Sequence, residues 1–492
     1  MPVLRPSHHA GANPPTIPLP PRRAILAGTA DVLVIGGGPA GMGAALGAAW
    51  AGADVVMVER HGFLGGNATA ALVMPLMSFH TQRGAPADVD NTRLMPSDHG
   101  PGEPIVAGAL ASFLERLIGA GGAIPPSGDT GYTVPFDPET YKVVAQEVVE
   151  EAGVRLLYHA FASGILGEPG WPEGVVFETK SGPVAVRAGT IIDCTGDGDV
   201  AALAGARFDV GRDGDGRVQP MTLMFRVGGF DRQAFADYVR AHPDQWRGVH
   251  GLWDLIAKAT ADGELDLPRE DILFFATPHE GEIAVNSTRV TGVLGTDVFD
   301  LTEAERLGKV QMGRIARFLR GYVPGFGKSY VIQSGVTVGV RETRRIVGDY
   351  RMTADDVLEA RKFDDGIARG SYPIDIHNPA GRGTVLKRLP PGEYYEIPLR
   401  CLLPQGVDRL MVAGRCISGS HEAHSSYRVT PTAMATGQAA GICAALAAQQ
   451  GDPVGARGLG HQHLAARQGE DHARVVEPRA IGRHREALGR PW

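Results

Sequence analysis

The stretch DVLVIGGGPAGMG, residues 31–43, decides the fold. Residues 31–35 form a short apolar run typical of a buried strand, and residues 36–41 have the G-x-G-x-x-G spacing. An alanine-rich helix is expected at residues 44–51, and a second strand at residues 54–58. Strand, glycine turn, helix and strand make a βαβ unit. Its turn directs backbone N–H groups and the positive end of the helix dipole at a pyrophosphate.

The second strand ends at Glu59. A carboxylate at this position accepts hydrogen bonds from the two hydroxyls of an adenosine ribose, which favours FAD or NAD over a 2'-phosphorylated cofactor. A bare glycine turn also occurs where a helix only packs against a sheet. The strand context together with Glu59 makes that alternative the minor one.

Composition describes an ordinary globular chain and excludes several functions. The 492 residues are too many for one compact core, so two unequal domains or one domain with a large insertion are expected. The net charge of -7 and the absence of a dense Lys/Arg run argue against a nucleic-acid partner. Four cysteines without a C-x-x-C pair favour a reducing, cytoplasmic location. No apolar run reaches membrane-spanning length, so no membrane span is expected.

The change in the pattern of expected strands and helices along the chain predicts a discontinuous first domain. Strand–helix patterns dominate up to about residue 219, short β-rich runs come next, and strand–helix patterns return after about residue 385. The predicted organisation is a disordered arm (1–23), the first part of a nucleotide-binding domain (24–219, with a loop or lid at 81–104), a substrate domain (220–385), the last part of the nucleotide-binding domain (386–451) and a C-terminal tail (452–492).

Local signals also predict individual elements. Asp137 and Pro138 supply an N-cap and a first helical residue. Thr302 and Glu305 indicate a capping box with Leu307, Val310 and Phe318 on one helix face. The further strands are expected at residues 154–158, 190–194, 222–227, 273–276, 283–285, 330–338 and 409–413, and the further helices at residues 138–153 and 432–448.

The choice between FAD and NAD depends on the segment after Glu59. Residues 60–69, RHGFLGGNAT, resemble the second nucleotide-contacting segment of FAD enzymes with the two-dinucleotide-binding, glutathione-reductase-like fold. Together with residues 34–59, 193–198 and 412–441, they make the chain similar, over roughly residues 31–450, to the FAD-dependent oxidoreductase family distantly akin to fumarate reductase flavoproteins. The resemblance implies FAD and an α/β fold, in which a discontinuous Rossmann-like FAD-binding domain carries an inserted α+β substrate domain.

The resemblance also implies which residues contact FAD. In that family the segment matching residues 193–197 crosses near the diphosphate, and the helix that follows Thr430 points its N-terminus at the flavin pyrimidine ring. Cys194 departs from the family pattern, which usually has a small residue at this position. We expect Cys194 to be buried in place of that small residue and to have no redox role. The predicted FAD-binding residues are Gly36, Gly38, Pro39, Ala40, Gly41, Glu59, Arg60, Gly65, Gly66, Asn67, Thr69, Phe161, Cys194, Thr195, Gly196, Asp197, Gly414, Arg415, Thr432 and Ala433.

Residues 420–428, interpreted as a loop, hold the densest cluster of titratable side chains. Oxidation of a C–H bond beside an alcohol or amine needs a base near pH 7, and histidine suits that task. His424 is the candidate base, and His421 orients or replaces it. Tyr427 and Arg428 belong to the same catalytic cluster. Structural roles for the histidines, or covalent flavin attachment at one of them, are the alternatives.

Arg341 follows an expected strand, and its guanidinium group suits a carboxylate-bearing substrate. The alternative is a salt-bridged helix start. Second-rank candidates are Asn286 with Arg289, and Asp375 with His377. No metal site is predicted, because Asp375 and His377 lack a third ligand and the aspartate-rich stretches 193–199 and 213–216 lack the full calcium-loop series.

The leading functional hypothesis is an FAD-dependent dehydrogenase or oxidase that takes hydride from a small polar substrate to flavin N5. A carboxylate on that substrate is one option, and the electron acceptor and oligomeric state stay open. A single dinucleotide fingerprint argues against a dedicated NAD(P)H domain. The alternatives are a reductase of an activated double bond, a flavin monooxygenase, and a flavin-bearing RNA-modification partner, which the acidic balance disfavours.

Overall fold

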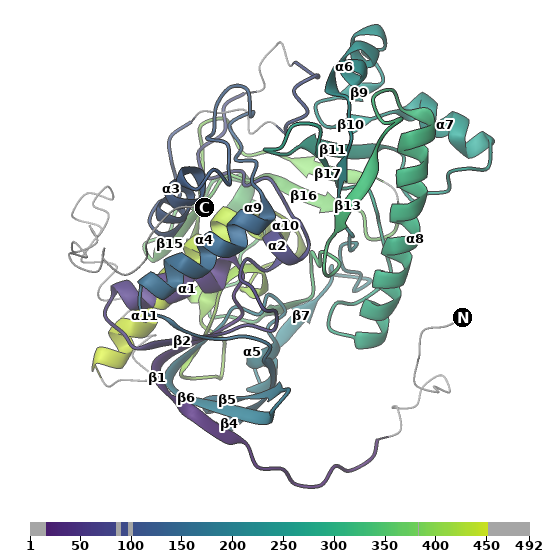
Figure 1. The fold of residues 1–492 in the computed structure, drawn as a ribbon. Coiled ribbons are helices and arrows are strands. Elements are labelled where there is room, and N and C mark those ends of the chain that lie inside the picture. Colours follow the sequence, from purple (N-terminus) through teal and green to yellow (C-terminus); the bar gives the residue numbers. More distant parts are fainter. Residues whose placement is uncertain (1–15, 85–89, 97–101, 382, 451–492) are drawn as a thin grey trace, which may run out of the picture.

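The computed structural model describes residues 16–84, 90–96, 102–381 and 383–450. One of its two large sheets has seven strands in the order β3-β2-β1-β6-β5-β4, and β19 also pairs with β6 (Figure 1). Its strands are β1 (Ile25–Ile35), β2 (Val55–Val58), β3 (Arg155–Leu157), β4 (Phe161–Glu168), β5 (Trp171–Thr179), β6 (Gly182–Asp193) and β19 (Leu410–Val412).

The centre of this sheet is parallel. β1 pairs in parallel with β2 and β6, β2 with β3, and β6 with β19, whereas β4, β5 and the first half of β6 form an antiparallel meander. β1 begins at Ile25 and β6 at Gly182, both earlier than expected. The first half of β1 pairs with the first half of β6, which also pairs with β5. Because these halves are partly exposed, they lack the continuous apolar run that marks a buried strand.

Eight of the described helices lie outside residues 225–334. They are α1 (Pro39–Trp50), α2 (Asn67–Ala70), α3 (Ala109–Gly119), α4 (Pro138–Glu151), α5 (Asp199–Leu203), α9 (Ala354–Leu358), α10 (His421–Tyr427) and α11 (Thr430–Gln450). Two short 3-10 turns lie at Leu399–Leu402 and Gly414–Cys416. The Asp137 cap of α4 is confirmed, since its carboxylate accepts a hydrogen bond from the Thr140 N–H at 2.8 Å.

α1 and α11 lie against each other at backbone contact (Figure 1). Glycines on both helices make this possible. A Cβ on Gly43 would lie 2.1 Å from the Met434 carbonyl oxygen, and one on Gly437 would lie 1.9 Å from the Ala40 carbonyl oxygen. Two segments far apart in sequence therefore meet beside the glycine turn of β1, as the predicted discontinuous α/β domain requires.

The second large sheet is antiparallel and lies wholly within residues 225–334. Its order is β13-β8-β12-β11-β10-β9, with α8 alongside it in Figure 1. Phe235, Phe274 and Phe326 form its aromatic core. Its elements are β8 (Phe225–Gly228), α6 (Arg232–Ala241), β9 (Trp246–Arg247), β10 (His250–Gly251), α7 (Trp253–Ala261), β11 (Ile272–Ala276), β12 (Ile283–Val285), α8 (Val298–Tyr322) and β13 (Tyr330–Ser334).

Two expectations in this region are wrong. α8 begins at Val298 because Asp297, not Thr302, caps it: the Asp297 carboxylate accepts from the N–H groups of Phe299 and Asp300. The Thr302 hydroxyl instead donates to the Val298 carbonyl inside the helix. β13 ends at Ser334, four residues before the expected Val338.

Three short ribbons connect the two sheets. They are β7 (Phe208–Val210) with β14 (Arg344–Ile346), β15 (Gly366–Gly370) with β18 (Tyr395–Pro398), and β16 (Ile374–His377) with β17 (Thr384–Lys387). The proposed domain boundary near residue 385 falls inside β17. A buried ion-pair network adds a further link, since Arg226 of β8 binds Glu282 at 2.7 Å and the α4 cap Asp137 at 3.4 Å.

The predicted arm, loop and tail fall partly or wholly outside the described residues. Residues 1–15 and the tail at 452–492 lie outside them, so those predictions stay open. Residues 16–24 have no regular secondary structure, and Arg22 forms an ion pair with Glu178 at 2.5 Å. The described parts of 81–104 contain no helix and one isolated bridge, between His80 and Pro104.

The α1–α11 contact leads to a prediction. Gly437→Ala places a methyl group against the Ala40 carbonyl, so the two helices must separate, and we expect a loss of about 1–3 kcal/mol in the free energy of unfolding. Gly321→Ala in α8 is the matched control, because no heavy atom lies within 4 Å of the added Cβ. Urea unfolding followed by circular dichroism measures both variants. Equal stability of the two would contradict the close contact.

Candidate active site

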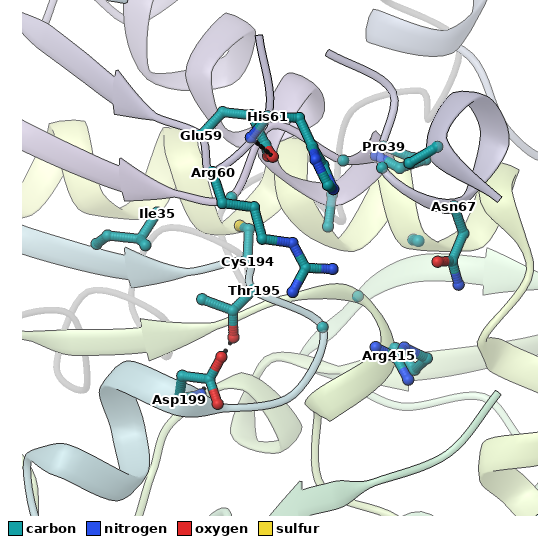
Figure 2. Close-up of a pocket in the computed structure, with 18 of the residues that line it drawn as sticks. Ile35, Pro39, Glu59, Arg60, His61, Asn67, Cys194, Thr195, Asp199 and Arg415 are labelled. Carbon is teal, nitrogen blue, oxygen red and sulfur yellow. Dashed lines mark hydrogen bonds between the residues drawn. The ribbon is translucent and has the colours of Figure 1, made fainter. Parts of the chain in front are cut away.

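A pocket of about 1030 Å³, including its open mouth, lies at the carboxyl ends of the parallel strands β1, β2, β6 and β19 (Figure 2). This is where α/β sheets place ligands. The loops after these strands form its wall together with residues of α2 and α11 and with Thr337, which lies between β13 and β14. The lining residues are Ile35, Gly36, Gly38, Pro39, Ala40, Val58, Glu59, Arg60, His61, Gly66, Asn67, Ala70, Ala160, Phe161, Ala162, Cys194, Thr195, Gly196, Asp199, Thr337, Ala413, Gly414, Arg415, Arg428, Thr430 and Ala433.

The glycine turn divides into structural and ligand-facing positions. Gly36 has a φ of 100°, and a Cβ there would lie 2.4 Å from the Cys194 carbonyl oxygen. A Cβ on Gly41 would lie 1.8 Å from the Gly36 carbonyl oxygen. Gly38 is different, because the nearest atom to its added Cβ is the Gly66 Cα at an ordinary 3.6 Å. Gly36 and Gly41 are therefore required by the fold, whereas Gly38 leaves room for a ligand.

Glu59 lines the pocket and is 5% exposed. Its Oε2 accepts from the Gly37 N–H at 2.6 Å, and its Oε1 accepts from the His61 N–H at 2.8 Å. Burial raises the pKa of Glu59, and the backbone hydrogen bonds oppose that rise. The two amides fix the carboxylate and leave each oxygen a second lone pair for a hydroxyl donor.

The loop after β6 carries three aspartates with distinct surroundings. Asp193 is fully buried and accepts from Thr195. Asp197 is held behind the wall by Arg415 at 2.7 Å and Thr343 at 2.8 Å. Asp199, which was not among the predicted residues, lines the pocket, and burial raises its pKa to about 6 despite its ion pair with Arg344.

Other predicted FAD residues also lie just behind the wall. Thr69 donates its hydroxyl to the Leu64 carbonyl, which fixes the turn at Gly65. Thr432 is buried, and its hydroxyl has no partner among the described residues. Five of the predicted FAD residues thus lie one layer behind the lining residues, namely Gly41, Gly65, Thr69, Asp197 and Thr432. The other fifteen line the pocket.

Cys194 is buried on the pocket wall. Burial, together with the neighbouring Asp193 charge, raises its pKa well above the usual thiol range. The group is therefore a protonated thiol at neutral pH, which agrees with the expectation of a buried substitute without redox chemistry.

Several lining residues were not predicted. His61 follows Arg60 directly, and burial lowers its pKa to about 4, so it is neutral in the pocket. Ala160 and Ala162 flank the predicted Phe161. Adjacency to predicted residues was the available signal for these three. Thr337 comes from the insert, where its N–H donates to the Ala70 carbonyl at 3.1 Å, and no local pattern marks it.

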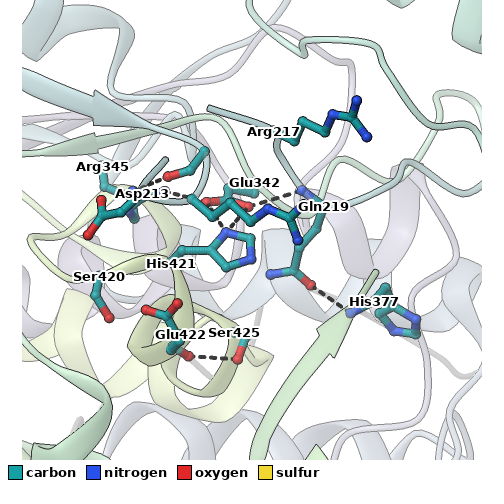
Figure 3. Close-up of polar contacts among 12 residues, drawn as sticks. Asp213, Arg217, Gln219, Glu342, Arg345, His377, Ser420, His421, Glu422 and Ser425 are labelled. Carbon is teal, nitrogen blue, oxygen red and sulfur yellow. Dashed lines mark hydrogen bonds and ion pairs between the residues drawn. The ribbon is translucent and has the colours of Figure 1, made fainter. Parts of the chain in front are cut away.

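Residues 421–427 form helix α10 rather than the expected loop, because the Ser420 side chain caps it by accepting from the Ala423 N–H. His421 and His424 are both buried and neither lines the pocket. Nδ1 of His421 lies 3.0 Å from a Glu342 oxygen (Figure 3). Tyr427 donates to the Ile417 carbonyl at 3.0 Å, and burial raises its pKa strongly, so it is a structural hydroxyl.

His424 has a different environment from His421. Both of its ring nitrogens are buried and lack a partner among the described residues. Burial, and then the charges of Arg345 and Arg428, lower its pKa well below the usual value. His424 is therefore neutral near pH 7.

Arg341 does not begin a helix, since residues 344–346 form strand β14, and the alternative of a salt-bridged helix start is wrong. Its Nη1 donates to the Pro220 carbonyl and to Thr222 Oγ1, each at 2.6 Å. Arg428 follows α10 and lines the pocket. Asp375 and His377 lie on β16, where Nε2 of His377 is 3.6 Å from the Asp375 carboxylate.

Neither a metal-ligand cluster nor a membrane-spanning helix occurs in the part of the chain that the structure describes. Among these residues, no group of three or more His, Cys, Asp or Glu side chains is placed to hold a metal ion. In the same part of the chain, no helix has both the length and the apolar character needed to cross a bilayer.

Comparison with known proteins agrees with this geometry. The family model described as FAD dependent oxidoreductase matches residues 31–457, so the chain belongs to that family. No curated protein gives a significant match. Among solved structures, similarity is found to a geranylgeranyl bacteriochlorophyll reductase-like protein from Thermoplasma acidophilum (15% identity, 90% of this chain and 82% of that chain, TM-score 0.41). A triple mutant of a flavin-dependent brominase is also similar (12% identity, 89% and 86% covered, TM-score 0.42).

A third similar structure is p-nitrophenol 4-monooxygenase from Pseudomonas putida, with 15% identity, 66% of this chain and 70% of that chain covered and a TM-score of 0.33. Likenesses of this size identify no reaction for this chain. The family membership establishes an FAD-dependent oxidoreductase. The pocket fits FAD: it joins a helix N-terminus, a glycine with free space at Gly38, and the fixed Glu59 carboxylate, and Nη1 of the lining Arg415 is buried without a partner in the described structure.

The two kinds of glycine give a prediction about the cofactor. Gly38→Ala should fold normally, because the added methyl group meets only an ordinary contact, but it should lose most of the bound FAD since the methyl group occupies the ligand side of the turn. Gly41→Ala should fail to fold stably. Flavin absorbance per protein and thermal unfolding separate the two effects. Full flavin content in Gly38→Ala would contradict the assigned role.

The environment of His424 gives a prediction about pH. A histidine whose folded pKa lies below its unfolded value of 6.5 costs stability as the pH falls below 6.5, because the unfolded state then binds the extra proton. His424→Gln removes this contribution. We expect its stability to fall less steeply than that of the native chain between pH 6.5 and 5.5, by up to about 1.4 kcal/mol per pH unit. The free energy of unfolding of both proteins is measured by urea titration at each pH. The same decrease with falling pH in His424→Gln and in the native chain would refute this prediction.

Proposed function

We propose that this FAD-dependent oxidoreductase oxidises a small polar substrate by transferring a hydride to N5 of the flavin. The observation that carries the proposal is a buried carboxylate–histidine pair, Glu342 and His421, at the beginning of helix α10, whose C-cap residue Arg428 lines the pocket that fits FAD. When bound, FAD supplies a two-electron acceptor for hydride. The protein must then bind the substrate and take up its proton.

The beginning of α11 supports the flavin-side part of this proposal. Thr430 and Ala433 line the pocket at the N-terminus of this helix, which runs from Thr430 to Gln450. The positive end of a helix dipole stabilises negative charge placed beside it. An N-terminus at this position would therefore favour acceptance of electrons by a flavin bound beside it.

The contacts of the two histidines favour His421 over His424 as the base. Glu342 in its ionised form only accepts, so Nδ1 of His421 carries the hydrogen and Nε2 is the proton acceptor. Nε2 is buried and has no partner among the described residues. His421 has a carboxylate as its neighbour. Protonation of His424 is opposed by Arg345 and Arg428.

Glu342 is itself fixed in place. It forms an ion pair with Arg345, and its Oε2 accepts from the Gln219 N–H at 3.0 Å. Arg345 is anchored in turn by donating to the Gly419 and Gly211 carbonyls. Because the carboxylate cannot turn, the His421 ring keeps one orientation. Glu342 is therefore a positioning residue in this proposal.

Anaerobic bleaching of the flavin absorbance across a panel of alcohols, amines and hydroxy acids tests the reaction. We expect at least one polar compound to reduce the bound flavin. If none does, while the chemically reduced enzyme is rapidly reoxidised by an activated double bond, the direction of the proposed reaction is wrong. Consumption of NAD(P)H with insertion of oxygen into a product would instead favour a monooxygenase.

The base assignment is tested with the first substrate found. His421→Gln should slow flavin reduction by about 10²–10⁴-fold with flavin content unchanged, and His424→Gln should slow it much less. Glu342→Gln should give an intermediate rate and a changed pH profile, because it removes the charge that orients His421. Stopped-flow reduction from pH 6 to 9 measures all three. A larger effect of His424→Gln would reverse the assignment.

A further inference from the structure

Four arginines gather beside the part of the pocket that Asn67 and Arg428 line. Arg269 and Arg289 come from the antiparallel sheet region, Arg341 precedes β14, and Arg428 follows α10. Arg428 lines the cofactor pocket itself. Arg341 is held next to the pocket by its neighbour, since Nδ2 of the lining Asn67 donates to the Val340 carbonyl at 3.1 Å.

The negative charges around this cluster do not balance it. Asp271 binds Arg269 at 2.5 Å, and the Asp375 carboxylate lies 3.9 Å from Arg428. Arg289 donates to the Gly381 carbonyl at 2.8 Å, whereas Arg341 donates only to a carbonyl and a hydroxyl. Within the described part of the chain, neither Arg289 nor Arg341 forms an ion pair.

The arginines lie close enough to influence one another. Burial, followed by the charge of Arg428, lowers the pKa of Arg341 to about 9, and burial with the charge of Arg269 also lowers that of Arg289. His377 is kept neutral by burial and by all four guanidinium groups. Buried cations without counter-ions are unfavourable, so this arrangement is explained if a ligand brings the missing negative charge.

Unused hydrogen-bond donors point to the same place. Nε of Arg428 and Nε2 of Gln219 are buried and have no partner among the described residues. Gln219 is 1% exposed, and its side chain lies between His421 and His377 in Figure 3. Its Oε1 is 3.4 Å from the His377 N–H, so its amide nitrogen is the end left free. A guanidinium and an amide nitrogen both donate to carboxylate oxygens.

We propose that Arg289, Arg341 and Arg428, with the Gln219 amide, bind the substrate as a dianion, such as a compound with two carboxylates. Four guanidinium groups face two nearby carboxylates, Asp271 and Asp375, so two charges are left for the ligand. A further acid that acts on Arg289, Glu270, is exposed to solvent. The planar guanidinium forks suit carboxylate oxygens. This inference rests on the proposed function, because it concerns the substrate of the same site.

Binding to the FAD-loaded enzyme tests the charge of the ligand. Isothermal titration calorimetry is run with malonate and succinate as dianions, acetate and butyrate as monoanions of related length, and succinamide as a neutral analogue. We expect at least one dianion to bind about tenfold more tightly than either monoanion, and succinamide not to bind. Added sodium chloride should weaken the dianion most.

Variants locate the site. Arg289→Met and Arg341→Met should each weaken dianion binding at least about tenfold while flavin content stays unchanged. Arg320→Met is the matched control, because Arg320 is exposed on α8, and it should bind as the native enzyme does. Arg341→Lys keeps the charge but loses the planar fork. It should therefore fall between the native enzyme and Arg341→Met, and it provides a test if a methionine variant does not fold.

The outcomes separate the two proposals. A yellow, folded enzyme that binds no dianion, or that binds acetate and malonate equally, overturns the dianion site and leaves the hydride-transfer proposal standing. Dianion binding that Arg289→Met and Arg341→Met leave unchanged also overturns the site. Tight dianion binding supports the site even if no member of the panel reduces the flavin, and the proposed direction of hydride transfer is then overturned if an activated double bond rapidly reoxidises the reduced enzyme.

Discussion

The structure depends on the backbone contact between α1 and α11. Gly43 and Gly437 remove the side chains that would hold these helices apart, and carbonyl oxygens of one helix lie where a Cβ of the other would be. The consequence reaches the pocket, because α1 begins at the glycine turn and α11 begins at Thr430. One contact thus places two helix N-termini on the wall of one cavity, although they come from distant parts of the sequence.

The α/β fold and the FAD cofactor were predictable without knowledge of this contact. The signals for the cofactor are local: the turn at residues 36–41, Glu59 and the segment at 65–69. Each of them is recognised from the strand or helix next to it in the sequence. Thr432 and Asp197 lie behind the pocket wall, which the sequence could not show, because a sequence indicates which segment borders a pocket but not which side of it faces inward. Asp199, two residues further on, has the pocket-facing position instead.

Residues 220–428 were less predictable for physical reasons. The Thr302 capping box had the right residue types, yet Asp297 caps α8 one turn earlier, and residue types alone cannot choose between two valid caps. The expected loop at 420–428 is a helix because Ser420 caps it. The pairing of His421 with Glu342 joins residues from distant segments, and so does the contact of Arg428 with Asp375. Such pairs follow from the packed insert rather than from any local pattern.

The two buried histidines show how one short helix provides two electrostatic environments. His421 faces a carboxylate that Arg345 and the Gln219 N–H hold in place, whereas the pKa of His424, one turn later, is lowered by burial and by the charges of Arg345 and Arg428. Arg428 belongs both to this field and to the proposed anion site. A substrate that brought negative charge to Arg428 would therefore oppose the effect of that charge on the pKa of His424 while it is bound. In the proposed site, binding of the ligand would thus be linked to the pKa of a histidine on the same helix as the proposed base.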